Sequence, residues 1–251
     1  VDDPRYDTFT NVENFEISNT DSDVIMTGDD NDNILTTDEG NDVIDGGAGD
    51  DTLNAGSGDD HLIGGEGNDI LILAGSGDSI LDGGVGIDTF KVNLSNWTPS
   101  IETYPNPFDY DNNNGFVYKV NLEGQFAGSK YDPDAKNNDT LIDIENVEYT
   151  GPYNAELTGD INDNVIIGGS GDDYISSGDG SDIITTGAGN DIVQNQKNHA
   201  ADSLALTDKI TDFEIGFDKI KLDDFLFSEI IISAGEGEYI NDAIISIEEG
   251  Y

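Results

Sequence analysis

The chain contains no cysteine and little positive charge, and both shortages narrow what it can be. Without cysteine, neither a disulfide nor a thiolate-bound metal can hold the fold. Nine lysines and arginines stand against 54 aspartates and glutamates, which gives a formal net charge of −45 over 251 residues. Such an acidic surface disfavours nucleic acid, anionic membranes and anionic polysaccharide as partners. The sequence also lacks an apolar run long enough for a transmembrane segment.

Hydrophobic residues are scarce as well, at 35% of the chain. Apolar burial alone therefore offers little to offset chain entropy and the mutual repulsion of the carboxylates. Folding calls for a cationic partner, and a hard cation that prefers oxygen ligands suits a surface of carboxylates.

What the chain does contain is a nine-residue repeat, Gly-Gly-x-Gly-x-Asp-x-apolar-x, in eleven copies. Clear examples are GGAGDDTLN at 46–54 and GGEGNDILI at 64–72. One apolar residue in nine gives no helical stripe and indicates a very short strand with one inward side chain. Stacked copies bury a continuous apolar column, which a single copy cannot do. We interpret the copies as residues 27–35, 37–45, 46–54, 55–63, 64–72, 74–82 and 83–91, then 158–166, 168–176, 177–185 and 186–194, with single insertions at Thr36, Leu73 and Ile167.

Three positions of the repeat carry the pattern. The eighth is apolar in every copy: Ile34, Ile44, Leu53, Leu62, Leu71, Leu81, Phe90, Val165, Ile175, Ile184 and Val193. The sixth is aspartate in all copies except the one with Ser79: Asp32, Asp42, Asp51, Asp60, Asp69, Asp88, Asp163, Asp173, Asp182 and Asp191. Glycine dominates the second and fourth positions: Gly28, Gly47, Gly49, Gly56, Gly58, Gly65, Gly67, Gly84, Gly86, Gly169, Gly171, Gly178, Gly180, Gly187 and Gly189.

These residue types suit calcium. Glycine permits the left-handed backbone that turns successive carbonyls toward one point. Calcium takes about 6–8 oxygen ligands, which a carboxylate and converging carbonyls from two stacked loops can supply. The aspartates and glycines above are therefore the predicted metal ligands and turn residues. No P-loop or EF-hand spacing is present.

If two copies make one turn of the coil, each loop faces the loop two copies later. The expected pairs are Asp32–Asp51, Asp42–Asp60, Asp51–Asp69, Asp69–Asp88, Asp163–Asp182 and Asp173–Asp191. A further pair, Asp60–Ser79, should be weaker because serine supplies no charge, although the adjacent Asp78 could substitute. This stacking predicts about seven calcium sites at most.

The nonapeptide resembles that of the RTX family, the hemolysin-type calcium-binding proteins of Gram-negative bacteria. That resemblance implies a parallel β-roll that folds in calcium outside the cell, after type I secretion. TDKITDFEIGFDKIKL at 207–222 also resembles the family segment that follows the last repeat. DTFTNVENFEI at 7–17 and DTLIDIENVEY at 139–149 resemble its lead-in, and their similarity indicates an internal duplication.

The sequence therefore predicts an all-β chain of two calcium-stacked parallel β-rolls with β-strand caps. The expected parts are a lead-in cap (1–26), a first roll (27–91), an intervening β-cap with the second lead-in (92–157), a second roll (158–194) and a C-terminal β-cap (195–251). The intervening part is rich in proline and aromatic residues, which suits either a cap or a patch for a partner.

Catalysis finds no support in the residues. HExxH and GxSxG motifs are missing, and His61 and His199 lie apart in the sequence. We expect a non-enzymatic, calcium-binding module of a secreted or cell-surface protein. Two alternatives stay open: a structural subunit, such as a surface layer, filament or adhesin, that assembles with itself or other surface proteins through calcium, and a targeting module of a secreted enzyme.

Overall fold

The computed structural model describes residues 8–9, 13–18, 21–73, 77–93, 117–129, 138–196, 208–223, 230–234 and 243–247. Every regular element within these ranges is a β-strand. The described residues include no helix that could cross a membrane. The expected all-β class is confirmed.

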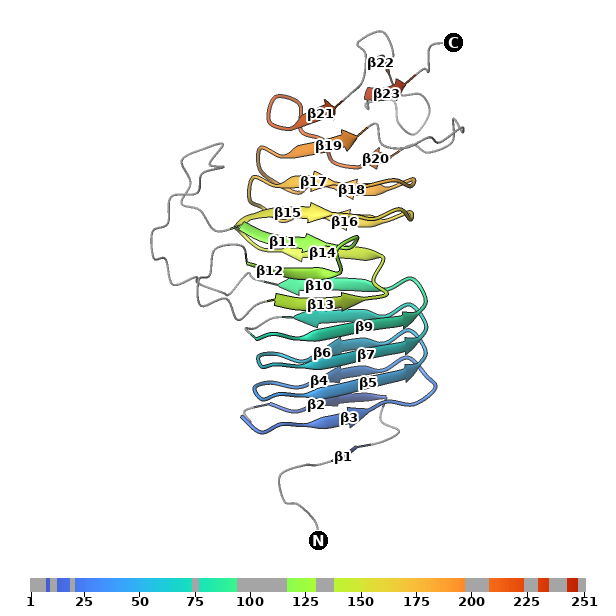
Figure 1. Cartoon of the computed structure of the whole chain (residues 1–251), viewed down its shortest axis with the longest axis vertical. Coiled ribbons are helices and arrows are strands. Elements are labelled where there is room, and N and C mark those ends of the chain that lie inside the picture. The colour runs from blue at the N-terminus through green and yellow to red at the C-terminus, as the bar shows by residue number, and fades with distance from the viewer. Residues whose placement is uncertain are drawn as a thin grey trace, which may run out of the picture.

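The strands form two long sheets that face each other in a tall stack (Figure 1). The first sheet contains, in spatial order, β1 (Thr8–Phe9), β3 (Ile25–Thr27), β5 (Val43–Ala48), β7 (His61–Glu66), β9 (Ile80–Val85), β13 (Asn138–Ile142), β12 (Phe126–Ser129), β11 (Val117–Asn121), β15 (Asn154–Thr158), β17 (Tyr174–Ser176), β19 (Ile192–Gln196) and β21 (Lys219–Asp223). The second contains β2 (Asn14–Glu16), β4 (Ile34–Thr36), β6 (Thr52–Asn54), β8 (Ile70–Leu73), β10 (Thr89–Asn93), β14 (Asn146–Thr150), β16 (Val165–Ile167), β18 (Ile183–Thr185) and β20 (Lys209–Ile210). A separate hairpin joins β22 (Ile230–Ala234) to β23 (Ala243–Ile247).

The pairing register shows that two repeats make one coil. Val43 in β5 lies opposite His61 in β7, 18 residues later, and the strands are parallel. After the predicted insertion at Leu73 the offset becomes 19, since His61 pairs with Ile80. Alternate repeats therefore fall in opposite sheets, as expected for a parallel β-roll.

Each repeat directs one apolar side chain, at the same position in every copy, into the space between the sheets. These side chains are at most 3% exposed, and they form one column: Leu35, Ile44, Leu53, Leu62, Leu71, Leu81, Phe90, Ile166, Ile175, Ile184 and Val193. Burying such a side chain contributes roughly 1.5–3 kcal/mol. Since each coil supplies only two, stability depends on neighbouring coils.

The first repeat of each array is one residue out of the predicted frame. Leu35 is fully buried opposite Leu53, whereas Ile34 is 54% exposed. In the second array Ile166, rather than Val165, is the fully buried residue. The predicted inward positions of Ile34 and Val165 are therefore wrong. The copies span 28–36 and 159–167, and neither Thr36 nor Ile167 is an insertion.

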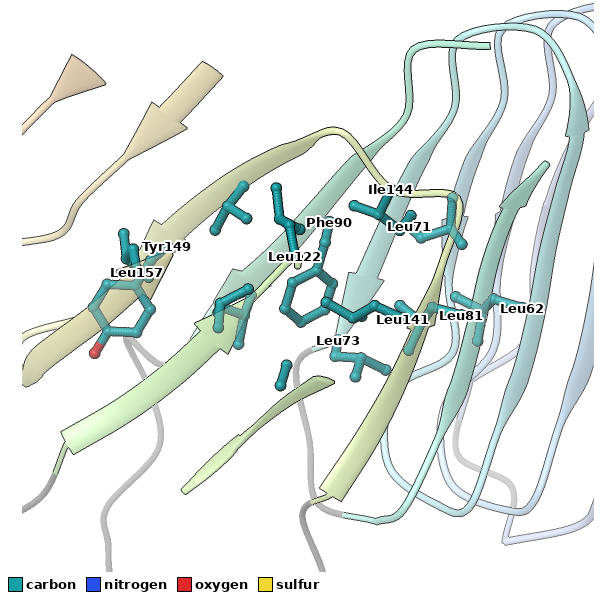
Figure 2. Close-up of a cluster of buried hydrophobic side chains, with 14 of the residues drawn as sticks. Leu62, Leu71, Leu73, Leu81, Phe90, Leu122, Leu141, Ile144, Tyr149 and Leu157 are labelled. Carbon is teal, nitrogen blue, oxygen red and sulfur yellow. The ribbon is translucent and has the colours of Figure 1, made fainter. Parts of the chain in front are cut away.

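The expectation of a cap between two separate rolls also differs from the structure. β10 of the first array pairs in parallel with β14, which pairs with β16 of the second array. In the other sheet, β13, β12 and β11 link β9 to β15. Buried side chains from this segment, including Leu122, Leu141 and Tyr149, continue the apolar column (Figure 2). Both sheets therefore run unbroken from one array to the other.

The flanking segments extend the stack in the same way. β1 and β2 of the first lead-in pair with β3 and β4. At the other end, β20 and β21 pair with β18 and β19, so the segment after the last repeat forms a further coil. Most of the proline- and aromatic-rich stretch, at 94–116 and 130–137, lies outside the described residues.

Candidate metal centre

A ladder of carboxylates runs along each edge of the stack, at the turn before each strand. The backbone N–H of Asp51 donates to Oδ1 of Asp69, one coil later, over 2.7 Å. The N–H of Asp69 donates in turn to Oδ1 of Asp88, also over 2.7 Å. On the other edge the N–H of Asp42 donates to Oδ1 of Asp60. We call this arrangement the position-six ladder, because each acceptor is the sixth residue of its repeat.

In most repeats the second carboxylate oxygen of the position-six aspartate has no hydrogen-bond partner. Seven aspartates have a buried Oδ2 without a hydrogen bond: Asp42, Asp51, Asp60, Asp69, Asp88, Asp182 and Asp191. All seven side chains are at most 3% exposed. A buried anionic oxygen without a partner is costly, so the position-six ladder favours either a bound cation or protonation of its carboxylates.

The ladder's electrostatics support the same conclusion. Burial, opposed by a backbone hydrogen bond, raises the pKa of Asp51, Asp69 and Asp88 to about 6. The same cause raises the pKa of Asp60 to about 7 and that of Asp173 to about 8. Neighbouring carboxylates add to these shifts. Without a cation, the fold therefore disfavours the charged form of its own side chains.

Backbone carbonyls converge on the free oxygens. A Cβ placed on Gly46 would lie 2.3 Å from Oδ2 of Asp51 and 2.7 Å from the carbonyl oxygen of Gly64. One coil later, a Cβ on Gly64 would meet Oδ2 of Asp69 at 2.3 Å and the carbonyl of Gly83 at 2.5 Å. A carboxylate oxygen and a carbonyl oxygen thus flank one point beside Gly46, Gly64, Gly83 and Gly168. This oxygen-only donor set fits a hard divalent cation.

Most of the fourth-position glycines have positive φ, and a backbone carbonyl of the neighbouring coil lies too close to each fourth-position glycine to leave room for a side chain. Gly67 has a φ of +137°, and a Cβ there would lie 2.0 Å from the carbonyl oxygen of Gly49. Most of the predicted glycines share a φ between +77° and +152°: Gly47, Gly49, Gly56, Gly58, Gly65, Gly67, Gly84, Gly178, Gly180, Gly187 and Gly189. Gly86, Gly169 and Gly171 have no such φ, but a Cβ on each would also clash with a carbonyl oxygen.

A family model of the RTX calcium-binding nonapeptide repeat, in four copies, matches residues 17–52, 36–71 and 158–193. These segments are RTX calcium-binding nonapeptide repeats. The resemblance drawn from the sequence is confirmed. The matches cover much of both arrays and leave residues 72–157 outside. No curated protein matches the chain.

The frame shift in the first repeat of each RTX array corrects two predicted ligands. Asp32 and Asp163 are exposed and occupy position five, where Oδ1 accepts the N–H of Asp50 and of Ser181 respectively. Asn33 and Asn164 hold position six instead, and both are buried. The predicted pairs with Asp51 and Asp182 are therefore made by asparagines, whose N–H groups donate to those carboxylates. Gly28 correspondingly occupies position one, where a Cβ would clash with Oδ1 of Asn33.

The other predicted pairs lie where two repeats per coil would place them. Asp42–Asp60, Asp51–Asp69, Asp69–Asp88 and Asp173–Asp191 are each joined by a backbone N–H to Oδ1 bond. Oδ2 of Asp173 differs from the rest, because it accepts the N–H of Gly169 at 3.0 Å.

Ser79 takes the position-six place opposite Asp60, and the weaker calcium site predicted for this pair stays a prediction. The Ser79 hydroxyl accepts the N–H of Asp60 at 3.2 Å and donates to the carbonyl of Gly58. Asp78 is exposed, and its N–H donates to the side chain of Asp59, so it belongs to the position-five row rather than to the ladder.

Four further carboxylates continue the ladder beyond the RTX repeats. Asp139 accepts the N–H of Ser79, and Glu145 accepts that of Asp88. Asp208 and Asp218 likewise accept the N–H groups of Asp182 and Asp191. None of the four was predicted as a ligand from the sequence. The available signal was a single acidic-x-apolar triplet, such as Asp139-Thr140-Leu141.

Among the described residues, no three acidic or histidine side chains converge as a conventional metal cluster. The repeat explains why, because each loop brings one carboxylate and the remaining oxygens come from backbone carbonyls.

Proposed function

We propose that this chain is a non-catalytic module of a secreted or cell-surface protein that folds when it binds calcium. The observation that carries the proposal is the set of seven buried Oδ2 atoms without a hydrogen-bond partner. The RTX repeats support it, because this calcium-binding repeat family is typical of secreted bacterial proteins.

The proposed mechanism is thermodynamic linkage. In low calcium the 54 acidic residues repel one another and the buried carboxylates oppose folding. Calcium binds the stacked coils and not the unfolded chain, so it shifts the equilibrium by RT ln(1 + [Ca]/Kd) for each site. Extracellular calcium modules bind with a Kd of about 10⁻⁴–10⁻³ M. With such a Kd the chain would stay unfolded in the low calcium of the cell interior and would fold outside the cell. Neighbouring sites share a loop, so binding and folding should be cooperative.

The residues that would hold calcium are the buried ladder aspartates, together with carbonyls of first-position glycines such as Gly64 and Gly83. At position five, Asp32 and Asp163 are exposed, and their carboxylates accept backbone N–H groups. We therefore propose that they stabilise the turn and do not bind calcium. About seven ions stays the upper bound that we propose for the nonapeptide repeats.

The test combines far-UV circular dichroism with size-exclusion chromatography and light scattering, in millimolar calcium and in excess EGTA. We expect a compact β-rich monomer in calcium and an expanded chain in EGTA, with magnesium unable to replace calcium. β structure that persists in excess EGTA would refute the proposal. Defined oligomers that appear only with calcium would instead assign the chain to assembly.

A further inference from the structure

The turn between β13 and β14 occupies the place of a repeat loop, although it is shorter than one. In the preceding coil nine residues separate the inward side chains of Leu81 and Phe90, whereas their partners Leu141 and Val147 are only six residues apart. The coil still stays in register, because Thr89 in β10 lies opposite Asn146 in β14. The N–H of Asn146 donates to the carbonyl of Asp88, as the N–H of Thr89 donates to that of Asp69.

The short turn places a carbonyl oxygen where the repeats have one. A Cβ on Gly83 would lie 2.2 Å from the carbonyl oxygen of Asp143 and 2.7 Å from Oδ2 of Asp88. The corresponding neighbours of Gly64 are the carbonyl of Gly83, at 2.5 Å, and Oδ2 of Asp69, at 2.3 Å. The carbonyl of Asp143 thus takes the place of a first-position glycine carbonyl.

Glu145 takes the place of the next position-six aspartate. Its Oε2 accepts the N–H of Asp88 at 2.7 Å, the same length as the regular rung between Asp69 and Asp88. Oδ2 of Asp88 is buried and has no hydrogen-bond partner, and the whole residue is 0% exposed. This orphaned oxygen is the independent sign that the turn is built around a ligand.

Backbone strain at Asp143 supports the same reading. Its φ of +48° is uncommon for a residue other than glycine, although aspartate tolerates it better than most. Ile144 is 7% exposed and packs into the apolar column among Leu71 and Phe90 (Figure 2). This anchor fixes Asp143 and Glu145 on either side of it, so the strained carbonyl is held toward Asp88.

We propose that Asp88, the carbonyl of Asp143 and the carboxylate of Glu145 form a calcium site outside the nonapeptide repeats. The site would join the last repeat of the first array to β14, the strand that leads into the second array. It rests on the proposed function only in requiring that the repeats bind calcium. Its consequence is that one ion fastens the two arrays together.

The test is to count calcium ions in folded chains by equilibrium dialysis, at free calcium just sufficient to saturate the wild type. Glu145→Gln keeps an oxygen for the N–H of Asp88 and removes the charge. We expect this variant to fold in calcium, to hold one ion fewer, and to bind that ion about tenfold or more weakly. Glu123→Gln changes an exposed turn residue and should match the wild type.

A second variant separates the backbone ligand from the side chain. Asp143→Asn tolerates the same φ and keeps the carbonyl, so it should retain the full count. An unchanged count in Glu145→Gln, with calcium-dependent folding of the wild type intact, would overturn this site and leave the proposed function standing. Failure of Glu145→Gln to fold in saturating calcium while Asp143→Asn folds would show a structural role and also overturn it. A wild type that binds no calcium would refute the proposed function itself.

Discussion

Asp69→Asn should reduce the calcium dependence of stability by one site. Asp69 is buried, and burial raises its pKa to about 6, so at neutral pH its charge opposes folding of the calcium-free chain. A calcium site whose Kd is a hundredfold below the calcium concentration stabilises the fold by about 2.7 kcal/mol, which opposes this destabilisation. Asparagine removes both the buried charge and the calcium ligand, and its Oδ1 can still accept the N–H of Asp51. The variant should be more stable than the wild type in low calcium and less stable in high calcium.

The assay is urea unfolding, followed by circular dichroism, across a tenfold range of calcium above the folding midpoint. Each site that fills on folding adds up to about 1.4 kcal/mol per decade of calcium, so the slope for Asp69→Asn should fall by about that amount. Asp50→Asn is the matched control, because Asp50 is exposed and its Oδ1 accepts the N–H of Asn68. Equal slopes for the two variants would refute the assignment of Asp69 as a ligand.

Three further predictions test other parts of the structure. In calcium-free buffer, acid should restore β structure. Burial raises the pKa of Asp51 and Asp69 to about 6 and that of Asp60 to about 7, so the calcium-free fold gains stability as the pH falls through these values. Circular dichroism that stays disordered from pH 8 to pH 5 would contradict this. Gly67→Ala should lower the melting temperature in calcium far more than Gly216→Ala, since both have positive φ but only Gly67 faces a carbonyl at 2.0 Å. Leu35→Ala should cost about 2–5 kcal/mol in urea unfolding and Ile34→Ala less than about 1 kcal/mol; the reverse order would restore the original repeat frame.

The repeat period was sufficient to predict the coil, because a period of nine with one apolar residue has few stable packings. It could not fix the frame where two apolar residues adjoin. Ile34-Leu35 fits either frame, and only the pairing of Leu35 with Leu53 decides between them. The prediction placed Asp32 at position six because that position is aspartate in most copies. In the structure the next residue, Asn33, holds position six.

The continuity of the stack was hidden from the sequence for a different reason. β9 and β13 pair although Ile80 and Thr140 are 60 residues apart, so no local periodicity links them. Glu145 replaces an aspartate and Asp143 replaces a glycine, so the turn that contains them keeps only the acidic-x-apolar triplet Glu145-Asn146-Val147 of the nonapeptide. Such substitutions become visible only when the coils are superposed in space.

The strands are stacked one above another along the long axis of the molecule, so the hydrogen bonds between them follow that axis (Figure 1). This direction has a mechanical consequence. Tension applied along the stack would pull against the backbone hydrogen bonds of one coil at a time instead of shearing many together. A coil of 18 residues adds about 4.8 Å to the folded length, but about 60 Å once it is drawn out. The stack would therefore lengthen more than tenfold by peeling, at a force set by the calcium concentration, and would recoil as ions return.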